Sequence, residues 1–273
     1  MYYLVQLDFD RRIARRSVRY FLLMPFSLVL MATVPDGLFL LFSVLCLLFL
    51  RKRLFPLANL FAMLAVLTHA LGVLLFFPVV TAFISYLIGN IRSNREMGKG
   101  YFLRQIGNAV SFLLIPLGVG LVLLYAKLKF GDPMALYRAA LGTHGVGLSD
   151  LFRFSDTALD QTLTVGNHSL WIFCGTYLTE FLYLIFGLVM LLLACGTVPT
   201  AYTILMAVTL PVLVAVGRTS DAARIVTMTA PFVITFAARI KRRWVDFVIT
   251  LLLAAGWVAY FFAFIAGFTG GIG

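Results

Sequence analysis

The sequence predicts an all-α, polytopic membrane protein with about nine spans and a cytoplasmic N-terminus. Of its 273 residues, 62% are hydrophobic and 26 are Phe, and the mean hydropathy is +1.01. A soluble domain could not bury that much apolar surface. Most of the Lys and Arg residues also stand in short segments between long apolar runs. We therefore expect residues 1–273 to form a single integral membrane domain.

The distribution of cations predicts how the chain crosses the membrane. Sixteen of the 22 Lys and Arg residues stand in four clusters. Because cations mark cytoplasmic segments, all four clusters are expected on the cytoplasmic side, with an even number of crossings between consecutive clusters. This arrangement, rather than nucleic-acid binding, accounts for the net charge of +11. The clusters are Arg11, Arg12, Arg15, Arg16 and Arg19; Arg51, Lys52 and Arg53; Arg92, Arg95, Lys99 and Arg104; and Arg239, Lys241, Arg242 and Arg243.

The first half of the chain is expected to contain five helices. A basic cytoplasmic segment, 1–19, comes before them. The turn between the first two helices is placed at Pro35-Asp36, because one long span would hold Asp36 in hydrocarbon at a cost of at least ~2.5–3.5 kcal/mol. The next turn falls at "THALG", so Asp36 and His69 are predicted on the same, non-cytoplasmic side. The five helices are expected at about 20–34, 36–50, 54–68, 72–90 and 103–126.

The second half begins with a polar stretch and ends with four helices. Residues 127–169 hold two of the three His residues and several Asp, Gly, Ser and Thr residues, which is typical of an external loop. The segment "GRTSDAAR" and the C-terminus are then also expected outside. Four further helices complete nine crossings, at about 170–194, 198–216, 223–238 and 244–266.

The N-terminal stretch has a basic region followed by an apolar one, like a signal peptide. The apolar run lacks a small-residue cleavage site at a suitable distance, so we expect the segment to be retained. Its five Arg residues are spaced by one, three and four positions, so they spread over much of a helix surface. We expect a solvated interfacial helix that lies on anionic headgroups. The alternative is a specific site for a lipid phosphate.

The three cysteines are Cys46, Cys174 and Cys195, and all fall inside apolar runs. Their spacing matches neither a disulfide framework nor a zinc site. We expect them to be small buried residues.

Three features on the expected external side have both a structural and a functional interpretation. Asp36 follows Pro35 at a helix start, where it is either an acid favoured by the helix dipole or a site acid near the membrane surface. His69 is either a polar residue at a helix break or a contact for an anionic substrate. Asp132, in "FGDP", is first of all a turn residue.

The segment "GRTSDAARIVTMTAPF" is the most informative of the external features. Arg218, Asp221 and Arg224 stand together at the start of an apolar helix. Cations at a helix N-terminus suit a phosphate group. A structural Arg–Asp pair at the membrane interface explains the same residues equally well.

Motifs of soluble enzymes are absent from the sequence. It contains no Gly-rich phosphate loop, no Gly-x-Ser-x-Gly and no His-Glu-x-x-His. Any catalysis is therefore expected to use acids and cations at the membrane surface.

Several segments, in order, resemble one family of membrane enzymes. The stretch from "PFSLVLMATVPDG" to "LTHALGVLLFFPVV", then "LLYAKLKFGDPMALYRA", then "GRTSDAARIVTMTAPFVITFAARI", is similar to the mannosyltransferases of phosphatidylinositol-glycan class V (PIG-V) and their bacterial relatives. The resemblance covers roughly 10–240. The succession of these features is specific, whereas each motif alone is not.

The resemblance implies a GT-C glycosyltransferase in a bacterial cell membrane or the endoplasmic reticulum membrane. Such enzymes transfer a sugar from a polyprenyl-phosphate donor to a lipid or glycan acceptor on the non-cytoplasmic side. No cofactor besides the lipid-linked donor is implied, and a divalent cation stays an open alternative. The expected partners are membrane lipids, the lipid-linked donor and a membrane protein, with no nucleic acid. Asp36 is the expected catalytic residue, and the expected substrate-binding residues are His69, Asp132, Arg218, Asp221 and Arg224.

The chain also departs from the family pattern. Val34-Pro35-Asp36 stands where the family has Tyr-Ser-Glu, and His69 after Thr68 stands where it has Arg. The family's essential acid lies in the first external loop, and this sequence is expected to begin after that loop. The activity is therefore left open, and a non-catalytic or degenerate partner of a glycosyltransferase is the alternative. A transporter is less favoured, since Glu180 is nearly the only acid inside an expected span and no internal repeat is evident.

Overall fold

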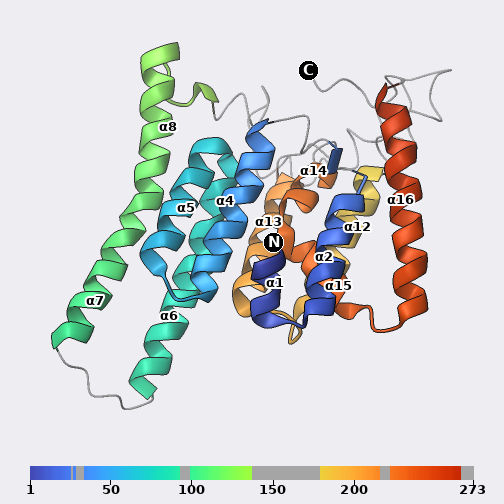
Figure 1. Cartoon of the computed structure of the whole chain (residues 1–273). Coiled ribbons are helices and arrows are strands. Elements are labelled where there is room, and N and C mark those ends of the chain that lie inside the picture. The colour runs from blue at the N-terminus through green and yellow to red at the C-terminus, as the bar shows by residue number, and fades with distance from the viewer. Residues whose placement is uncertain (26, 29–33, 93–98, 137–178, 216–221, 266–273) are drawn as a thin grey trace. The chain divides into compact units, whose positions relative to one another are not determined.

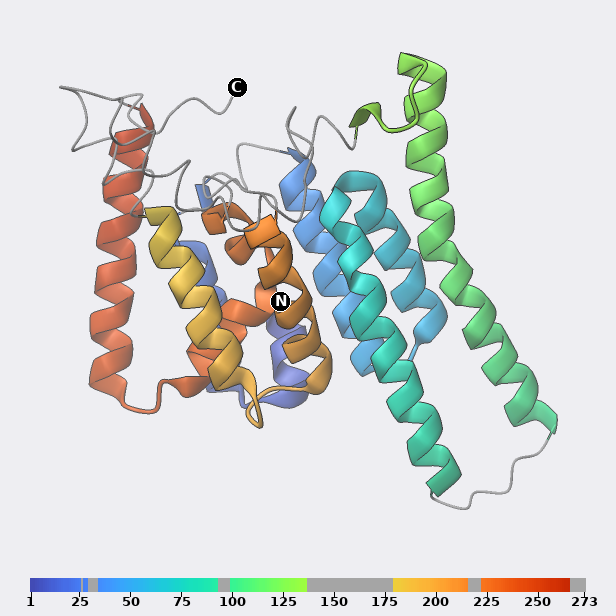
Figure 2. The same ribbon diagram turned by 180° about the vertical axis from the view of Figure 1, so that it is seen from behind.

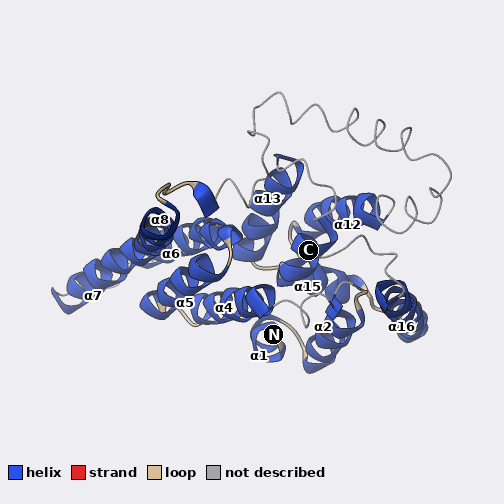
Figure 3. Cartoon of the chain, turned by 90° about the horizontal axis from the view of Figure 1, so that it is seen from above, coloured by secondary structure: helices blue, strands red, loops and turns tan. Residues whose placement is uncertain are grey.

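The computed structural model describes residues 1–25, 27–28, 34–92, 99–136, 179–215 and 222–265. Its described residues form helices and connecting turns without a strand, which confirms the all-α prediction for them (Figure 3). The chain divides into two compact units, which are described separately. Unit 1 comprises Met1–Thr33, His144–Val198 and Met206–Gly273, and unit 2 comprises Val34–Thr143 and Pro199–Leu205.

Unit 2 is built on a helical hairpin of α4 (Val34–Arg51) and α5 (Phe55–Thr68). The two helices pack closely along their length (Figure 1). Phe61 of α5 lies between two rings of α4, at 5.3 Å from Phe49 and 6.3 Å from Phe42 between centroids. These helices confirm the ones expected at 36–50 and 54–68.

Helix α5 is the centre of unit 2. Ala58, Ala62 and Ala65 are fully buried, and their small side chains allow neighbouring backbones to approach closely. Two 3-10 turns and three helices pack on α5 besides α4. They are η1 (Ala70–Leu75), α6 (Phe76–Arg92), α7 (Lys99–Val110), η2 (Ser111–Leu113) and α8 (Leu114–Phe130).

A chain of buried polar groups ties α5 to the rod formed by α7, η2 and α8 (Figures 1 and 3). Asn59 Nδ2 donates to Ser111 Oγ at 2.8 Å, and Ser111 Oγ donates to the carbonyl oxygen of Asn108 at 2.6 Å. Asn108 Nδ2 in turn donates to Gln105 Oε1 at 3.2 Å. The bond between Asn59 and Ser111 joins two elements, and an interhelical hydrogen bond of this kind fixes the register of helices whose surfaces are otherwise apolar.

Unit 1 is organised around the short helix α15 (Ala230–Arg239), whose residues Ala230–Thr235 are all buried. It lies between α2 (Arg11–Leu23) and α12 (Thr179–Ala194) (Figures 1 and 2). The unit also contains α1 (Tyr2–Asp8), α14 (Ala222–Met228), α16 (Arg243–Ile265) and the part of α13 (Thr200–Ala215) that follows Leu205.

Two expected helices differ from the structure because of proline. Of the helix expected at 20–34, residues 20–23 belong to α2, which begins at Arg11 and ends at Leu23, and residues 26 and 29–33 lie outside the described residues. Met24 takes an extended conformation (φ −62°, ψ 132°), since the residue before a proline is disfavoured in the α region, and Pro25 follows it. The helix expected at 223–238 is divided at Thr229 into α14 and α15, with Pro231 in the first turn of α15.

The cysteine prediction is correct at one position and wrong at another. Cys46 of α4 is fully buried. Cys195 is exposed, because α12 ends at Ala194 and the chain turns at Gly196, whose φ is 74°. Both are free thiols, and Cys174 lies outside the described residues.

Among the described residues, three helical segments are long and apolar enough to cross a membrane: Ala70–Arg92, Gln105–Phe130 and Arg243–Phe262. Their lengths of 23, 26 and 20 residues correspond to about 30–39 Å at 1.5 Å per residue, against ~30 Å for the hydrocarbon core. Large apolar side chains on them stay exposed in this chain, among them Leu113, Leu252 and Phe262. Such surface suits contact with lipid.

Glycine substitutions test the packing of η1 against α5. A Cβ atom on Gly72 would overlap the backbone of Ala65 and Val66. We expect Gly72→Ala to lower the free energy of unfolding by about 1–3 kcal/mol, as overpacking does in a close-packed core. The measurement is thermal unfolding of the purified protein in detergent, followed by circular dichroism.

Gly89→Ala is the matched control. This glycine lies inside α6, and nothing would stand within 4 Å of its Cβ atom. Because alanine is the better helix former, the variant should gain roughly 0.5–1 kcal/mol. Equal stability of the two variants would contradict the packing of η1.

Candidate functional site

Asp36 is a buried carboxylate in the first turn of α4. It follows Pro35, and its side chain is 0% exposed. An acid in the first turn interacts favourably with the positive end of the helix dipole. A fully buried acid is nevertheless uncommon, so its position is informative. Helix α4 begins at Val34, near the expected helix start, but Pro35 and Asp36 are helical, so the turn expected at these two residues is wrong.

His69 stands at the break between α5 and η1. It is the C-cap of α5 and the N-cap of η1, and its Nδ1 accepts a hydrogen bond from the backbone N–H of Leu71 at 3.1 Å. In the neutral ring the proton is therefore on Nε2. Protonation of Nδ1 would remove the cap. The structure thus supports the interpretation of His69 as a polar residue at a helix break.

The structure brings Asp36 and His69 to the same end of the α4–α5 hairpin. The ring of Phe39, one helical turn after Asp36, lies 5.3 Å from the His69 ring between centroids. Residues three apart on a helix share a face. The cations Arg51 and Arg53 lie at the opposite end of this hairpin, at its turn. A carboxylate and an imidazole are therefore gathered at one end, as the sequence predicts.

Asp132 forms the turn that follows α8. Helix α8 ends at Phe130 and is capped by Gly131, which has a positive φ of 75°. Asp132 Oδ1 accepts a hydrogen bond from Met134 N–H at 2.9 Å. The expectation that "FGDP" forms a turn is confirmed. Helix α8 starts beside Asn59 and passes Met63 at Gly118, so it runs parallel to α5 toward the end that carries His69.

The other expected site residues belong to the segment before α14. Arg224 lies in α14, in unit 1, and its side chain is outside the described part of the structure. Arg218 and Asp221 lie outside the described residues. A phosphate site and an Arg–Asp pair both stay predictions for these three residues.

An ion cluster in unit 1 was missed by sequence reasoning. Asp246 lies in the first turn of α16, and its Oδ1 atom is 3.1 Å from Arg16 Nε. The same oxygen accepts a hydrogen bond from Arg19 Nη2 at 2.5 Å. Arg16 also donates from Nη1 to the carbonyl oxygens of Ala237 and Ile240. One buried guanidinium thus joins α2 to the end of α15 and to α16.

This cluster corrects one part of the expected N-terminal segment. Four of its Arg residues are exposed, as expected of an interfacial helix, but Arg16 is only 5% exposed. Its face of α2 is shared with buried Ser17 and Tyr20. The signal that could have revealed the pair is Asp246 itself, an acid three residues after the last basic cluster.

Tyr20 completes the cluster. Its hydroxyl donates to Asp246 Oδ1 at 2.7 Å. It lies in α2, outside the three candidate spans. Burial, and then the hydrogen bond to the carboxylate, raise the pKa of Tyr20 above its ordinary value. The phenol therefore stays protonated and remains a donor at all physiological pH values.

Chemically, the same end of the α4–α5 hairpin holds the carboxylate of Asp36 and the imidazole of His69, whose proton is on Nε2 in the neutral ring. Carboxylates and imidazoles are the usual groups for general acid–base catalysis. Within the described ranges, no three His, Cys, Asp or Glu residues are grouped so that they could hold a metal ion.

Comparison with models of known protein families, with curated proteins and with solved structures found no match to this chain.

Substitution of Asp246 tests the ion cluster. In Asp246→Asn, Arg16 keeps its buried position without a carboxylate. Removal of one partner of a buried pair costs about 3–5 kcal/mol, and the partial exposure of Asp246, at 20%, favours the lower end of that range. We expect a clear fall in the unfolding midpoint in detergent.

Asp10→Asn makes the same chemical change at an exposed residue that caps α2 without a side-chain hydrogen bond. It should leave the midpoint nearly unchanged. If the two variants were equally stable, Asp246 would not stabilise unit 1.

Proposed function

We propose that this chain is a multi-pass membrane protein of about nine spans and a GT-C-type glycosyltransferase similar to the PIG-V mannosyltransferases. It would transfer a sugar from a polyprenyl-phosphate donor to a lipid or glycan hydroxyl on the non-cytoplasmic side. The observation that carries the proposal is buried Asp36, which lies at the same end of the α4–α5 hairpin as His69 and at the opposite end from Arg51 and Arg53. Three apolar helices of membrane-spanning length support the location.

In the proposed reaction the acceptor hydroxyl attacks the anomeric carbon of the donor sugar. A carbon–oxygen bond forms there as the bond between the anomeric carbon and the phosphate oxygen breaks. The hydroxyl proton passes to the carboxylate of Asp36, and polyprenyl phosphate leaves with the electron pair of the broken bond. General base catalysis of this kind contributes typically about 10²–10⁴-fold.

The leaving phosphate needs positive charge as the bond breaks. Arg218 and Arg224 are proposed for that task, since they precede and begin a helix. His69 is proposed to contact the substrate as a neutral donor through Nε2, because its Nδ1 already accepts the N–H of Leu71.

A sugar-transfer assay tests the role of Asp36. Purified protein in proteoliposomes would be given polyprenyl-phosphate mannose and a glycosylphosphatidylinositol-type acceptor. We expect Asp36→Asn to lower kcat by about 10²-fold or more, the contribution of a general base. Asp36→Glu keeps a carboxylate and should restore part of the rate.

Asp10→Asn serves as the control for this assay, since its exposed carboxylate lies at the start of α2. Thermal unfolding of each variant in the same preparation separates loss of chemistry from loss of fold. Full activity of folded Asp36→Asn would remove Asp36 from the mechanism. Transfer by neither the wild type nor any variant would favour a non-catalytic partner.

The proposed topology is tested by cysteine labelling in intact cells, with the native cysteines replaced. A reagent that does not enter the cytoplasm should modify a cysteine introduced by Ser149→Cys and leave one introduced by Lys52→Cys unmodified. The reason is that cations are retained on the cytoplasmic side. The reverse pattern would overturn the orientation.

A further inference from the structure

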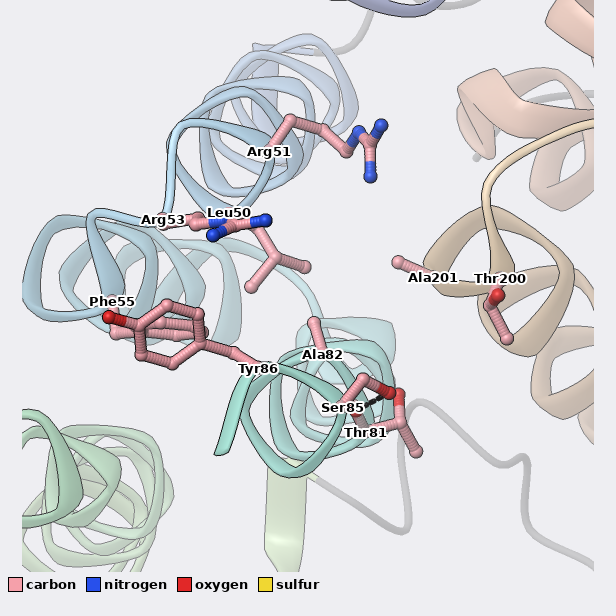
Figure 4. Close-up of a pocket in the computed structure, with 10 residues that line it drawn as sticks. All are labelled: Leu50, Arg51, Arg53, Phe55, Thr81, Ala82, Ser85, Tyr86, Thr200 and Ala201. Atoms are coloured by element: carbon pink, nitrogen blue, oxygen red, sulfur yellow. Dashed lines mark hydrogen bonds between the residues drawn. The ribbon is translucent and has the colours of Figure 1, made fainter. Parts of the chain in front are cut away.

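A pocket of ≈ 220 Å³ lies in unit 2 at the end of the hairpin away from Asp36 (Figure 4). Arg51 and Arg53 contribute from the end of α4 and the turn after it. Tyr86 of α6 contributes a second wall, and Thr200 and Ala201 contribute the start of α13. The pocket is therefore formed by the end of α4, the starts of α5 and α13 and one face of α6, all within unit 2.

The backbone at Arg53 is in a conformation that normally calls for glycine. Leu54 N–H bonds to the carbonyl oxygen of Phe49, and Arg53 N–H bonds to that of Leu50. These two bonds form a Schellman motif, in which the residue at the position of Arg53 is usually glycine in the left-handed region. Arg53 has a φ of 60° and is the one non-glycine residue with positive φ among those described.

The side chain of Arg53 is held at the pocket by an aromatic ring. Its guanidinium carbon lies 5.3 Å from the centroid of the Tyr86 ring, which is a cation–π contact. Figure 4 shows this guanidinium and that of Arg51 at the same side of the pocket. The left-handed backbone conformation of Arg53 costs conformational free energy. A cation that only has to be solvated at the surface would not require this conformation.

The start of α13 adds a third positive group on the far wall. The first N–H groups of a helix have no carbonyl partner within it, and they carry the positive end of the helix dipole. Thr200 and Ala201 are such residues, and both line the pocket. No acidic residue is among the described lining residues. Two guanidiniums thus face a helix N-terminus across a small cavity.

We propose that this pocket binds a phosphate group, either that of a lipid headgroup or that of a free phosphate compound. Arg guanidiniums and helix N-termini are the two protein features that best fit phosphate oxygens. The hydroxyls of Thr81 and Ser85 donate to backbone carbonyl oxygens of α6, at 2.8 Å each. The Arg53 guanidinium and the α13 N–H groups are therefore proposed as donors to the ligand, and Arg51 adds positive charge at the pocket. The site is separate from Asp36 and His69 and does not depend on the proposed transfer reaction.

The test uses the full-length protein in detergent, with short-chain phosphatidic acid, short-chain phosphatidylcholine and inorganic phosphate as probes. Bound lipid is counted by native mass spectrometry, and phosphate binding is measured by calorimetry. The informative variant is Arg53→Gly, because glycine suits the left-handed backbone, so the fold should be kept or stabilised while the guanidinium is lost. We expect the affinity to fall about tenfold or more, as the loss of a charge-assisted hydrogen bond implies.

Lys52→Ala is the matched control. Lys52 is the neighbouring exposed cation, it does not line the pocket, and the variant has the same net charge as Arg53→Gly. Its affinity should stay within about twofold of the wild type.

Each outcome decides the proposal. Selective binding of phosphatidic acid that is lost in Arg53→Gly but kept in Lys52→Ala supports a site for a lipid headgroup. Binding of inorganic phosphate as tight as that of phosphatidic acid, with the same loss of affinity in Arg53→Gly, supports a site for free phosphate compounds. Equal losses in Arg53→Gly and Lys52→Ala would mean attraction to general surface charge and would overturn the pocket. Failure of the wild type to bind any phosphate probe selectively over phosphatidylcholine would overturn it as well.

Discussion

The cost of removing a charge from water is the constraint on which this structure depends. An apolar helix of membrane-spanning length can hold ionised groups cheaply only at its ends. In unit 2, Asp36 lies in the first turn of α4 and Arg51 ends that helix, while Arg92 ends α6 and Lys129 lies in the last turn of α8. Acids at the starts of helices and cations at their ends also match the helix dipole. The cost of burying charge therefore limits the length of each apolar helix, and the helix dipole favours acids at its start and cations at its end.

Where a charge does lie within a packed unit, the structure supplies its partners. Arg16 is buried on α2, and it is matched by Asp246 and by two carbonyl oxygens at the end of α15. A buried ion pair contributes little net stability, but an unmatched buried ion is strongly destabilising. The value of this cluster is therefore that it fixes how α2, α15 and α16 meet.

The two ends of the α4–α5 hairpin have different chemistry. One end has a buried carboxylate and a neutral, capped imidazole, which suit proton transfer to or from a hydroxyl. The other end has guanidiniums from Arg51 and Arg53, with Tyr86 beneath the second, which suit an anion. The hairpin between these two ends is held by apolar contacts such as the stacking of Phe49 on Phe61.

The sequence by itself determined the helical class, most helix positions and the grouping of Asp36 with His69. These follow from composition, from the spacing of charges and from proline and glycine, all of which act locally or through the solvent. One local signal was read wrongly: Pro25 ends α2, and the helix expected at 20–34 does not begin at residue 20.

Only the tertiary structure decided which charges meet. Arg16 and Asp246 are separated by 230 positions along the chain, and no local pattern reports their contact. The pocket likewise depends on the start of α13 reaching Arg51 and Arg53, and on a positive φ at Arg53 where glycine would be expected. Such contacts arise from packing between distant segments, so the sequence predicts the charged residues and the fold selects their partners.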